Sequence, residues 1–209
     1  MKKTVLAAGL AFCVLSAFAG TTNSAAEAET QYTAAIENRA ADILKVLSLT
    51  DTNQAARVHE AIVAQYRALR AWHVENDAQL KAAKADTNAV APLCASLKSL
   101  HEKFLARLGE NLSPGQIEQV KDKMTYGKVP FTFSGYLAQY PHLSGENQAE
   151  ILRLLTQARE EAMDGGSAEE KTAIFQRYKG RINNYLSKQG VHAEKKTAAS
   201  KVETNAPVK

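Results

Sequence analysis

The sequence predicts an all-α fold, a helical bundle of about six helices with one irregular aromatic loop at about 126–134. Apolar residues recur at three- and four-residue spacing over long segments, and helix-start signals precede several of those segments. Signals for β-strands are weaker. With 209 residues, of which 45% are hydrophobic and 23% charged, the chain is long enough to bury a core of its own.

The first two helices are expected at about 27–47 and 51–84. Asp51 precedes the second of them, where its carboxylate can accept hydrogen bonds from the free amides of the first turn. Helical spacing places a largely apolar stripe on one side of this helix, and we expect that side to face the core. The stripe consists of Ala55, Val58, Ile62, Tyr66, Leu69, His73 and Leu80.

The next two helices are expected at about 89–110 and 114–125. The later one begins with the segment Ser113-Pro114-Gly115-Gln116, in which Ser is the N-cap, Pro is the first helical residue and Gln completes a capping box. The earlier one carries an apolar stripe made of Leu93, Leu97, Leu100, Phe104 and Leu108. Stripes of this width favour a helical bundle over separate coiled coils.

The helical pattern breaks between about 126 and 134. Three aromatic residues lie there with Gly127 and Pro130, which indicates an irregular loop packed on the body, because a solvated linker would be more polar. A short helix fits the residues from 135 to 140, and Pro141 would end it.

The last two helices are expected at about 144–164 and 168–188. Gly165-Gly166 separates them, because glycine is favoured just past the end of a helix. Ser167 is placed to cap the last helix, and Gly190 follows its end. The aromatic loop therefore lies between two well-marked groups of helices.

The chain is expected to contain a signal peptide at 1–19, a single helical domain at 20–192 and a disordered polar tail at 193–209. Lys2-Lys3 precede an apolar stretch that ends in the small-x-small site Ala17-Phe18-Ala19, the pattern of a secretory leader. The mature protein would therefore be exported, to the periplasm or the extracellular space.

Cys13 could alternatively mark a lipoprotein cleavage site, but the bulky Phe12 just before it argues against this interpretation. Cleavage after Ala19 would remove Cys13 and leave Cys94 as the single cysteine, so no internal disulfide is expected. No run after the leader is long and apolar enough to form a transmembrane segment in the mature chain.

The basic residues in excess lie at the ends of the chain. The whole sequence has 26 Lys and Arg against 22 Asp and Glu. Two of the lysines are in the leader, and the tail holds four lysines against two glutamates, which leaves 20 basic and 20 acidic residues between them. A neutral body has no electrostatic footprint for nucleic acid, which we therefore exclude as a partner.

The candidate ligand-binding residues are aromatic, cationic and amide side chains of the aromatic loop and the last helix: Tyr126, Lys128, Tyr178, Lys179, Arg181, Asn184 and Tyr185. Tyrosine rings and multiple donors suit a sugar, an anion or a peptide backbone. In the alternative interpretation, Arg181 and Asn184 only satisfy carbonyl groups of the loop. Both interpretations require the segment 126–133 to fold over the last helix.

Catalytic and metal-binding patterns are weak, and no catalytic site, metal site or cofactor is predicted. His73 lies one turn before Asp77, which could orient its ring, but we favour a hydrogen-bonded core or interface histidine. Cys94 and His101 are two turns apart on one helix, about 10 Å, too far to share a metal ion. Glu160-Glu161 is interpreted as part of a solvated helix end.

Three strings resemble a family of secreted bacterial helical proteins whose domain has no known function. They are Met124-Thr125-Tyr126-Gly127-Lys128-Val129, the stretch from Ala158 to Asp164, and Tyr178-Lys179-Gly180-Arg181-Ile182-Asn183-Asn184-Tyr185-Leu186. The likeness runs from about 36 to 190 and implies an exported protein. The likeness identifies no catalytic or binding residues.

A second, weaker likeness concerns Leu112-Ser113-Pro114-Gly115-Gln116, which is similar to the Leu-Thr-x-x-Gln signature of periplasmic helical stress chaperones. The long aromatic segment and the neutral body depart from that group. The same five residues also form a capping box for purely physical reasons.

We therefore expect an exported, non-enzymatic binding protein of the cell envelope, whose partner is a glycan or a polypeptide. One alternative is a glycan-processing enzyme or accessory protein, which would need a carboxylate pair or a histidine-centred group converging in a pocket. Another is a chaperone-like or structural interaction domain, marked by a large exposed apolar patch.

Overall fold

The computed structural model describes residues 17–83 and 86–193, and within them it contains seven helices and no strand. The predicted lipoprotein cysteine, most of the predicted signal peptide and nearly all of the predicted tail lie outside the described residues. The helices are α1 (Ala17–Leu47), α2 (Thr52–Ala82), α3 (Thr87–Gly109), α4 (Pro114–Met124), α5 (Lys128–Gln139), α6 (Gly145–Met163) and α7 (Ala168–Lys188).

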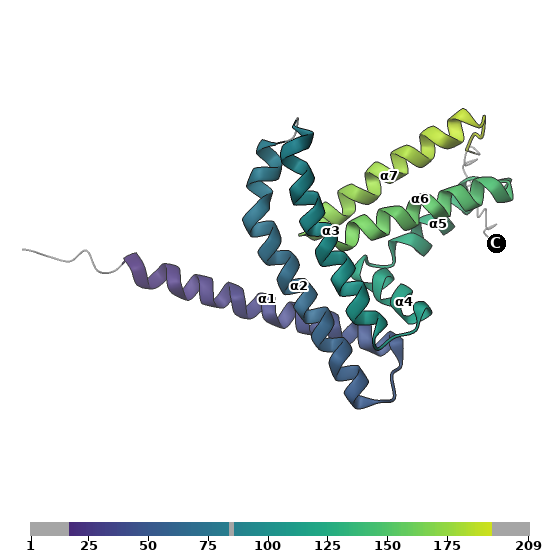
Figure 1. The fold of residues 1–209 in the computed structure, drawn as a ribbon. Helices are drawn as coiled ribbons and strands as arrows, with labels where there is room; N and C mark the ends of the chain where they lie inside the picture. Colours follow the sequence, from purple (N-terminus) through teal and green to yellow (C-terminus); the bar gives the residue numbers. More distant parts are fainter. Residues whose placement is uncertain (1–16, 84–85, 194–209) are drawn as a thin grey trace, which may run out of the picture.

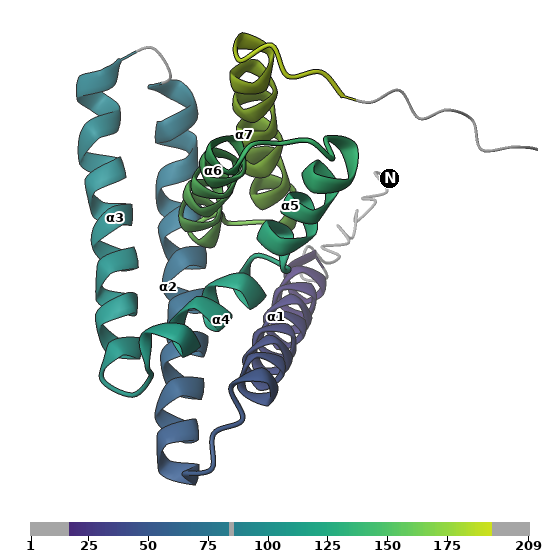
Figure 2. The ribbon, with the colours of Figure 1, turned by 90° about the vertical axis from the view of Figure 1, so that its right-hand side faces the viewer.

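Two helical hairpins form the framework of the fold. Helices α2 and α3 run side by side as one hairpin, and α6 and α7 pack together as the other (Figure 1). Helix α1 packs against α2 and α4, while its N-terminal turns extend away from the other helices. The short helices α4 and α5 carry the chain from the first hairpin to the second (Figure 2).

The buried side chains form two core clusters. The first contains residues of α1, α2, α3 and α4, and its fully buried residues include Ile36, Ile62, Leu108 and Val120. The second lies among α5, α6 and α7 and includes Ile151, Leu155, Ile182 and Leu186. The apolar face predicted for α2 is confirmed at Val58, Ile62, Leu69 and His73, all of which are buried.

Side-chain caps begin the helices where the sequence places them. Asp51 accepts hydrogen bonds from the backbone amides of Asn53 and Gln54 at the start of α2. Ser113 and Gln116 form both halves of a capping box at α4, in agreement with the sequence. The Ser167 hydroxyl accepts a hydrogen bond from the backbone amide of Glu170 at the start of α7.

The predicted aromatic loop at 126–134 is a tight turn followed by a helix. Gly127 has the left-handed conformation, with φ of 61°, and α5 begins at the next residue. Pro130 lies in the first turn of α5, where no amide hydrogen bond within the helix is required, so it does not interrupt the helix. The short helix expected at 135–140 is thus the second half of α5.

Gly166 allows the α6–α7 connection to approach α2 closely. A methyl group at this position would lie 2.7 Å from Cγ of the His73 ring. That ring cannot move aside easily, because hydrogen bonds at 2.8 and 2.7 Å hold both of its nitrogens. The contact therefore ties the connection between the second pair of helices to the first hairpin.

We predict that Gly166→Ala lowers the free energy of unfolding by about 1–3 kcal/mol, because the added methyl group must displace a buried ring. Gly180→Ala is the matched control, since Gly180 lies inside α7 with nothing within 4 Å of the added group. It should raise the free energy of unfolding by about 0.5–1 kcal/mol through better helix propensity. Urea denaturation measures the free energy of unfolding of both variants. Equal effects of the two substitutions would contradict the close approach of Gly166 to the His73 ring.

Candidate functional site

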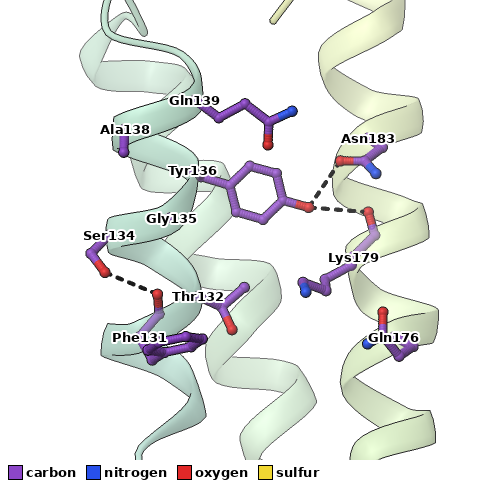
Figure 3. A pocket seen from close by; sticks show the side chains of 10 residues that line it. All are labelled: Phe131, Thr132, Ser134, Gly135, Tyr136, Ala138, Gln139, Gln176, Lys179 and Asn183. Carbon is purple, nitrogen blue, oxygen red and sulfur yellow. Dashed lines mark hydrogen bonds between the residues drawn. The ribbon is translucent and has the colours of Figure 1, made fainter. Parts of the chain in front are cut away.

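The aromatic segment does contact the last helix, but through a helical face. Tyr136 of α5 points toward α7, where its hydroxyl donates to Oδ1 of Asn183 at 2.9 Å and to the carbonyl of Lys179 at 3.3 Å (Figure 3). Val129 and Phe133 pack in the same cluster as the buried residues of α7. Burial raises the pKa of Tyr136 to about 12, so the hydroxyl stays protonated and able to donate.

A cavity of about 690 Å³ lies between α5 and α7. We call it the α5–α7 cavity, and it is lined by Phe131, Thr132, Ser134, Gly135, Tyr136, Ala138, Gln139, Gln176, Lys179 and Asn183. The cavity therefore combines amide, hydroxyl and ammonium groups with the aromatic rings of Phe131 and Tyr136 (Figure 3). Phe131 leaves 80% of its surface exposed, an unusual position for so large an apolar ring.

Lys179 is the one predicted ligand-binding residue that lines this cavity. Lys128 does not line the cavity, and its Nζ atom lies 6.0 Å from the ring centroid of Phe175. Tyr178 is buried, and the exposed Arg181 holds its guanidinium 4.9 Å from the centroid of the Tyr178 ring. Arg181 therefore covers an aromatic face and does not satisfy carbonyl groups of the aromatic segment.

The remaining predicted residues lie apart from the cavity. The Tyr185 hydroxyl donates to Oδ1 of Asn147 on α6 at 2.9 Å. Asn184 is exposed on α7. Tyr126 borders a different cleft, together with Arg39 and Tyr66. The seven predicted residues consequently do not form one site.

His73 and Asp77 do line a cavity together, which is the geometry that the enzyme alternative requires. Nδ1 of His73 lies 2.8 Å from the Asp77 carboxylate, and Nε2 lies 2.7 Å from the carbonyl of Asp164. Both partners are acceptors, so the ring must donate from both nitrogens. Burial lowers the pKa of His73, but these hydrogen bonds outweigh it and raise the pKa overall. A ring held in this way supports packing and leaves no nitrogen for a substrate.

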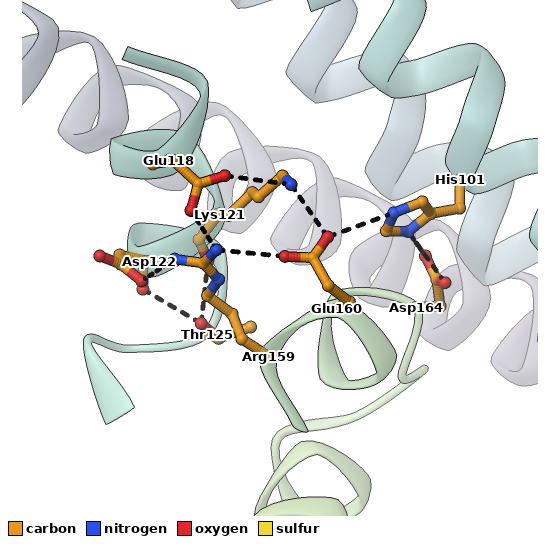
Figure 4. Close-up of polar contacts among 8 residues, drawn as sticks. All are labelled: His101, Glu118, Lys121, Asp122, Thr125, Arg159, Glu160 and Asp164. Atoms are coloured by element: carbon orange, nitrogen blue, oxygen red, sulfur yellow. Dashed lines mark hydrogen bonds and ion pairs between the residues drawn. The ribbon is translucent and has the colours of Figure 1, made fainter. Parts of the chain in front are cut away.

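A polar network missed by sequence reasoning joins α3, α4 and α6 (Figure 4). Nδ1 of His101 lies 3.0 Å from the Asp164 carboxylate, and its Nε2 lies 3.5 Å from that of Glu160. Glu160 also contacts Nζ of Lys121 at 3.0 Å and Arg159 at 3.2 Å. The prediction that Glu160 belongs to a solvated helix end is therefore wrong, because it is half-buried among three basic side chains.

Arg159 supplies the cation at the centre of this network. It is 4% exposed, and its guanidinium donates to Asp122 at 2.7 Å and to Glu118. The sequence contained a signal for this position, because 159 continues the i, i+4 spacing of the buried Ile151 and Leu155. The network links three helices, and among its residues only Asp122 borders a cavity, the cleft beside Tyr126. We therefore assign the network to stability.

The described residues contain no group of three His, Cys, Asp or Glu side chains that could hold a metal ion. Among the described helices, none is both long and apolar enough to cross a lipid bilayer.

No curated protein matches the chain. A family model described as "Protein of unknown function (DUF3826)" matches residues 33–203, most of the chain, and confirms the family resemblance. The chain therefore belongs to the DUF3826 family of proteins of unknown function.

Proposed function

We propose that the protein is an exported binding protein that holds a glycan in the α5–α7 cavity. The observation that carries this proposal is the position of Phe131, whose ring is 80% exposed at the rim of a cavity lined by polar side chains. An exposed aromatic face beside hydrogen-bonding groups suits a sugar ring, which has apolar C–H faces and polar hydroxyl edges.

The cavity has the composition that carbohydrate hydroxyls need. Gln139, Gln176 and Asn183 carry amides that both donate and accept, and Lys179 adds an ammonium donor. A volume of about 690 Å³ lies within the range of ligand sites and has room for more than one sugar unit. The Tyr136 hydrogen bonds fix the distance between the two helices, so the site is largely formed before a ligand binds.

Export forms part of the same proposal. Lys2-Lys3, the apolar stretch after them and Ala17-Phe18-Ala19 support a cleaved leader. A protein delivered beyond the inner membrane would meet cell-envelope or extracellular glycans. Mass spectrometry of exported material tests this part, and we expect the mature chain to begin at Gly20.

We predict that Phe131→Ala weakens glycan binding by about two- to tenfold, because stacking on an aromatic ring contributes roughly 0.5–1.5 kcal/mol. The melting temperature should barely change, since the ring is exposed. The measurement is the ligand-induced rise in melting temperature across a panel of soluble oligosaccharides.

Val74→Ala is the matched control, because Val74 of α2 is also 80% exposed and lies outside the cavity. It should leave the ligand-induced rise intact. A permanently unfolded polypeptide is tested in parallel. Protection by that polypeptide, with no response to any saccharide, would replace the glycan with a polypeptide partner.

A further inference from the structure

A second cleft lies where α1 and α2 meet the turn after α4 and the α6–α7 connection. It consists of two adjoining hollows of about 340 and 540 Å³, which share Arg39, Tyr66 and Tyr126. We call it the tyrosine–cation cleft, because its smaller hollow gathers three tyrosines and three basic side chains: Tyr32, Tyr66, Tyr126, Arg39, Arg70 and Lys171.

Lys171 is a cation held in the wall of the smaller hollow. It is 5% exposed, and its Nζ atom donates to the carbonyls of Ala162 and Met163 at 2.8 and 3.1 Å. An ammonium group has three donors, so one remains for a ligand. Burial, with a smaller contribution from Arg39, lowers the pKa of Lys171 to about 8, while the charges of Asp164 and Glu170 oppose this shift. An anion placed beside Lys171 would offset the free-energy cost of burying its positive charge.

The two arginines are arranged over tyrosine rings. Arg70 lies 4.0 Å from the centroid of the Tyr32 ring and pairs with Glu29 at 2.7 Å. Arg39 lies 5.7 Å from the centroid of the Tyr66 ring and makes no ion pair within the described residues. Its guanidinium retains its hydrogen-bond donors for a ligand.

The distribution of acidic residues selects one of the two hollows. The larger hollow contains two carboxylates, those of Asp42 and Asp122. The residues lining the smaller hollow include no Asp or Glu. An anionic group is therefore favoured in the smaller hollow, and the neutral part of a ligand could extend toward the larger one.

Tyr126 shows a second unusual feature of this cleft. Its φ of 60° places a non-glycine residue in the left-handed region, which costs an L-residue free energy. The ring is 51% exposed and borders both hollows. Strained backbone that presents a ring to a cleft is typical of binding sites.

We propose that the smaller hollow binds a sugar acid, with its carboxylate held by Arg39 and Lys171 and its ring packed against Tyr126. Arginine forks match the two oxygens of a carboxylate, and aromatic faces match the C–H faces of a sugar. A volume of about 340 Å³ suits a single unit. The proposal uses none of the residues that line the α5–α7 cavity, so either site can fail alone.

The test compares D-glucuronate with D-glucose, which differ by a carboxylate in place of a hydroxymethyl group, on the full mature chain by calorimetric titration. We expect the dissociation constant for glucuronate to be at least about tenfold lower than that for glucose. Arg39→Gln should raise it at least about fivefold, because a charge-assisted hydrogen bond is lost. Tyr126→Asn should weaken binding while preserving the turn, since asparagine tolerates the left-handed conformation.

Two controls separate this site from other effects. Arg57→Gln removes an arginine of α2 that lies outside the cleft and donates to Asn111 at 2.7 Å, and it should leave glucuronate binding unchanged. Phe131→Ala should also leave it unchanged. Equal affinity for glucose and glucuronate, or an Arg39→Gln variant that binds glucuronate normally, would overturn the proposal. If sulfate binds as tightly as glucuronate, the sugar ring does not contribute to binding, and this part of the proposal is wrong.

Discussion

Arg159→Ala is expected to lower the free energy of unfolding by about 3 kcal/mol, the largest stability effect of a single substitution that we predict. The guanidinium is 4% exposed and joins α6 to Asp122 and Glu118 of α4. Its removal leaves these carboxylates and Glu160 close together without their shared cation, and it also leaves a cavity. Urea denaturation at neutral pH measures the change.

Arg153→Ala is the control on the same helix. Arg153 pairs with Glu150 at 2.6 Å, but both lie where water already solvates the charges, so the effect should be much smaller. Adding Asp122→Asn to Arg159→Ala should restore part of the lost stability, because one of the clustered carboxylates loses its charge. Equal losses for Arg159→Ala and Arg153→Ala would show that the buried cation gives no net stabilisation.

Six helices could be predicted from the sequence because their ends depend on local chemistry. Asp51, Ser113 and Ser167 each satisfy amides two or three residues further on, and such short-range contacts are visible in the order of residues alone. The apolar stripe of α2 needed only the helical period. Both signals are independent of how the helices are arranged in space.

The first half of α5 was missed because its composition is misleading. Gly127 and Pro130 are usual loop residues, and three aromatics favour neither state strongly. The structure uses Gly127 for the left-handed turn and Pro130 within the first helical turn, so each residue has an allowed place in a helix start. Packing of Val129 and Tyr136 against the second core then stabilises the helix.

The candidate sites were predictable only in part, because they are formed by residues far apart in the chain. Lys179 was identified from its neighbours on one helix, whereas Phe131 reaches the same cavity from another. Arg39 of α1 and Lys171 of α7 line the same hollow although they lie far apart in the sequence. One-dimensional spacing contains no information on such pairings, which arise from the crossing of whole helices.

His101 should make stability depend on pH in a defined direction. Hydrogen bonds to Asp164 and then Glu160 outweigh burial and raise the pKa of His101 from 6.5 to about 9. A raised histidine pKa means that the folded state binds the proton more tightly than the unfolded state. The stabilisation is therefore complete below pH 6.5 and is lost as the pH rises through 9.

Glu160 sets the acid limit of the same network. Burial opposes its ionisation, but His101, Lys121 and Arg159 together lower the pKa of Glu160 to about 2. Its stabilisation is present above the ordinary value of 4.5 and is lost as the pH falls through 2. Both contributions are thus complete only between pH 4.5 and 6.5, where the network should be most stabilising.

We predict that His101→Gln removes an alkaline loss of stability on the order of 3 kcal/mol between pH 6.5 and 9. The readout is the difference between native and variant free energies of unfolding at each pH, which cancels two other contributions. The stabilising contribution of His73 also falls as the pH rises, while that of Lys171, whose pKa is lowered to about 8, increases above that pH.

Lys98→Gln, on the exposed side of α3, is the control and should keep the native dependence of stability on pH. Parallel curves for the native protein and His101→Gln would show that the His101 contacts contribute no net stabilisation in the folded state.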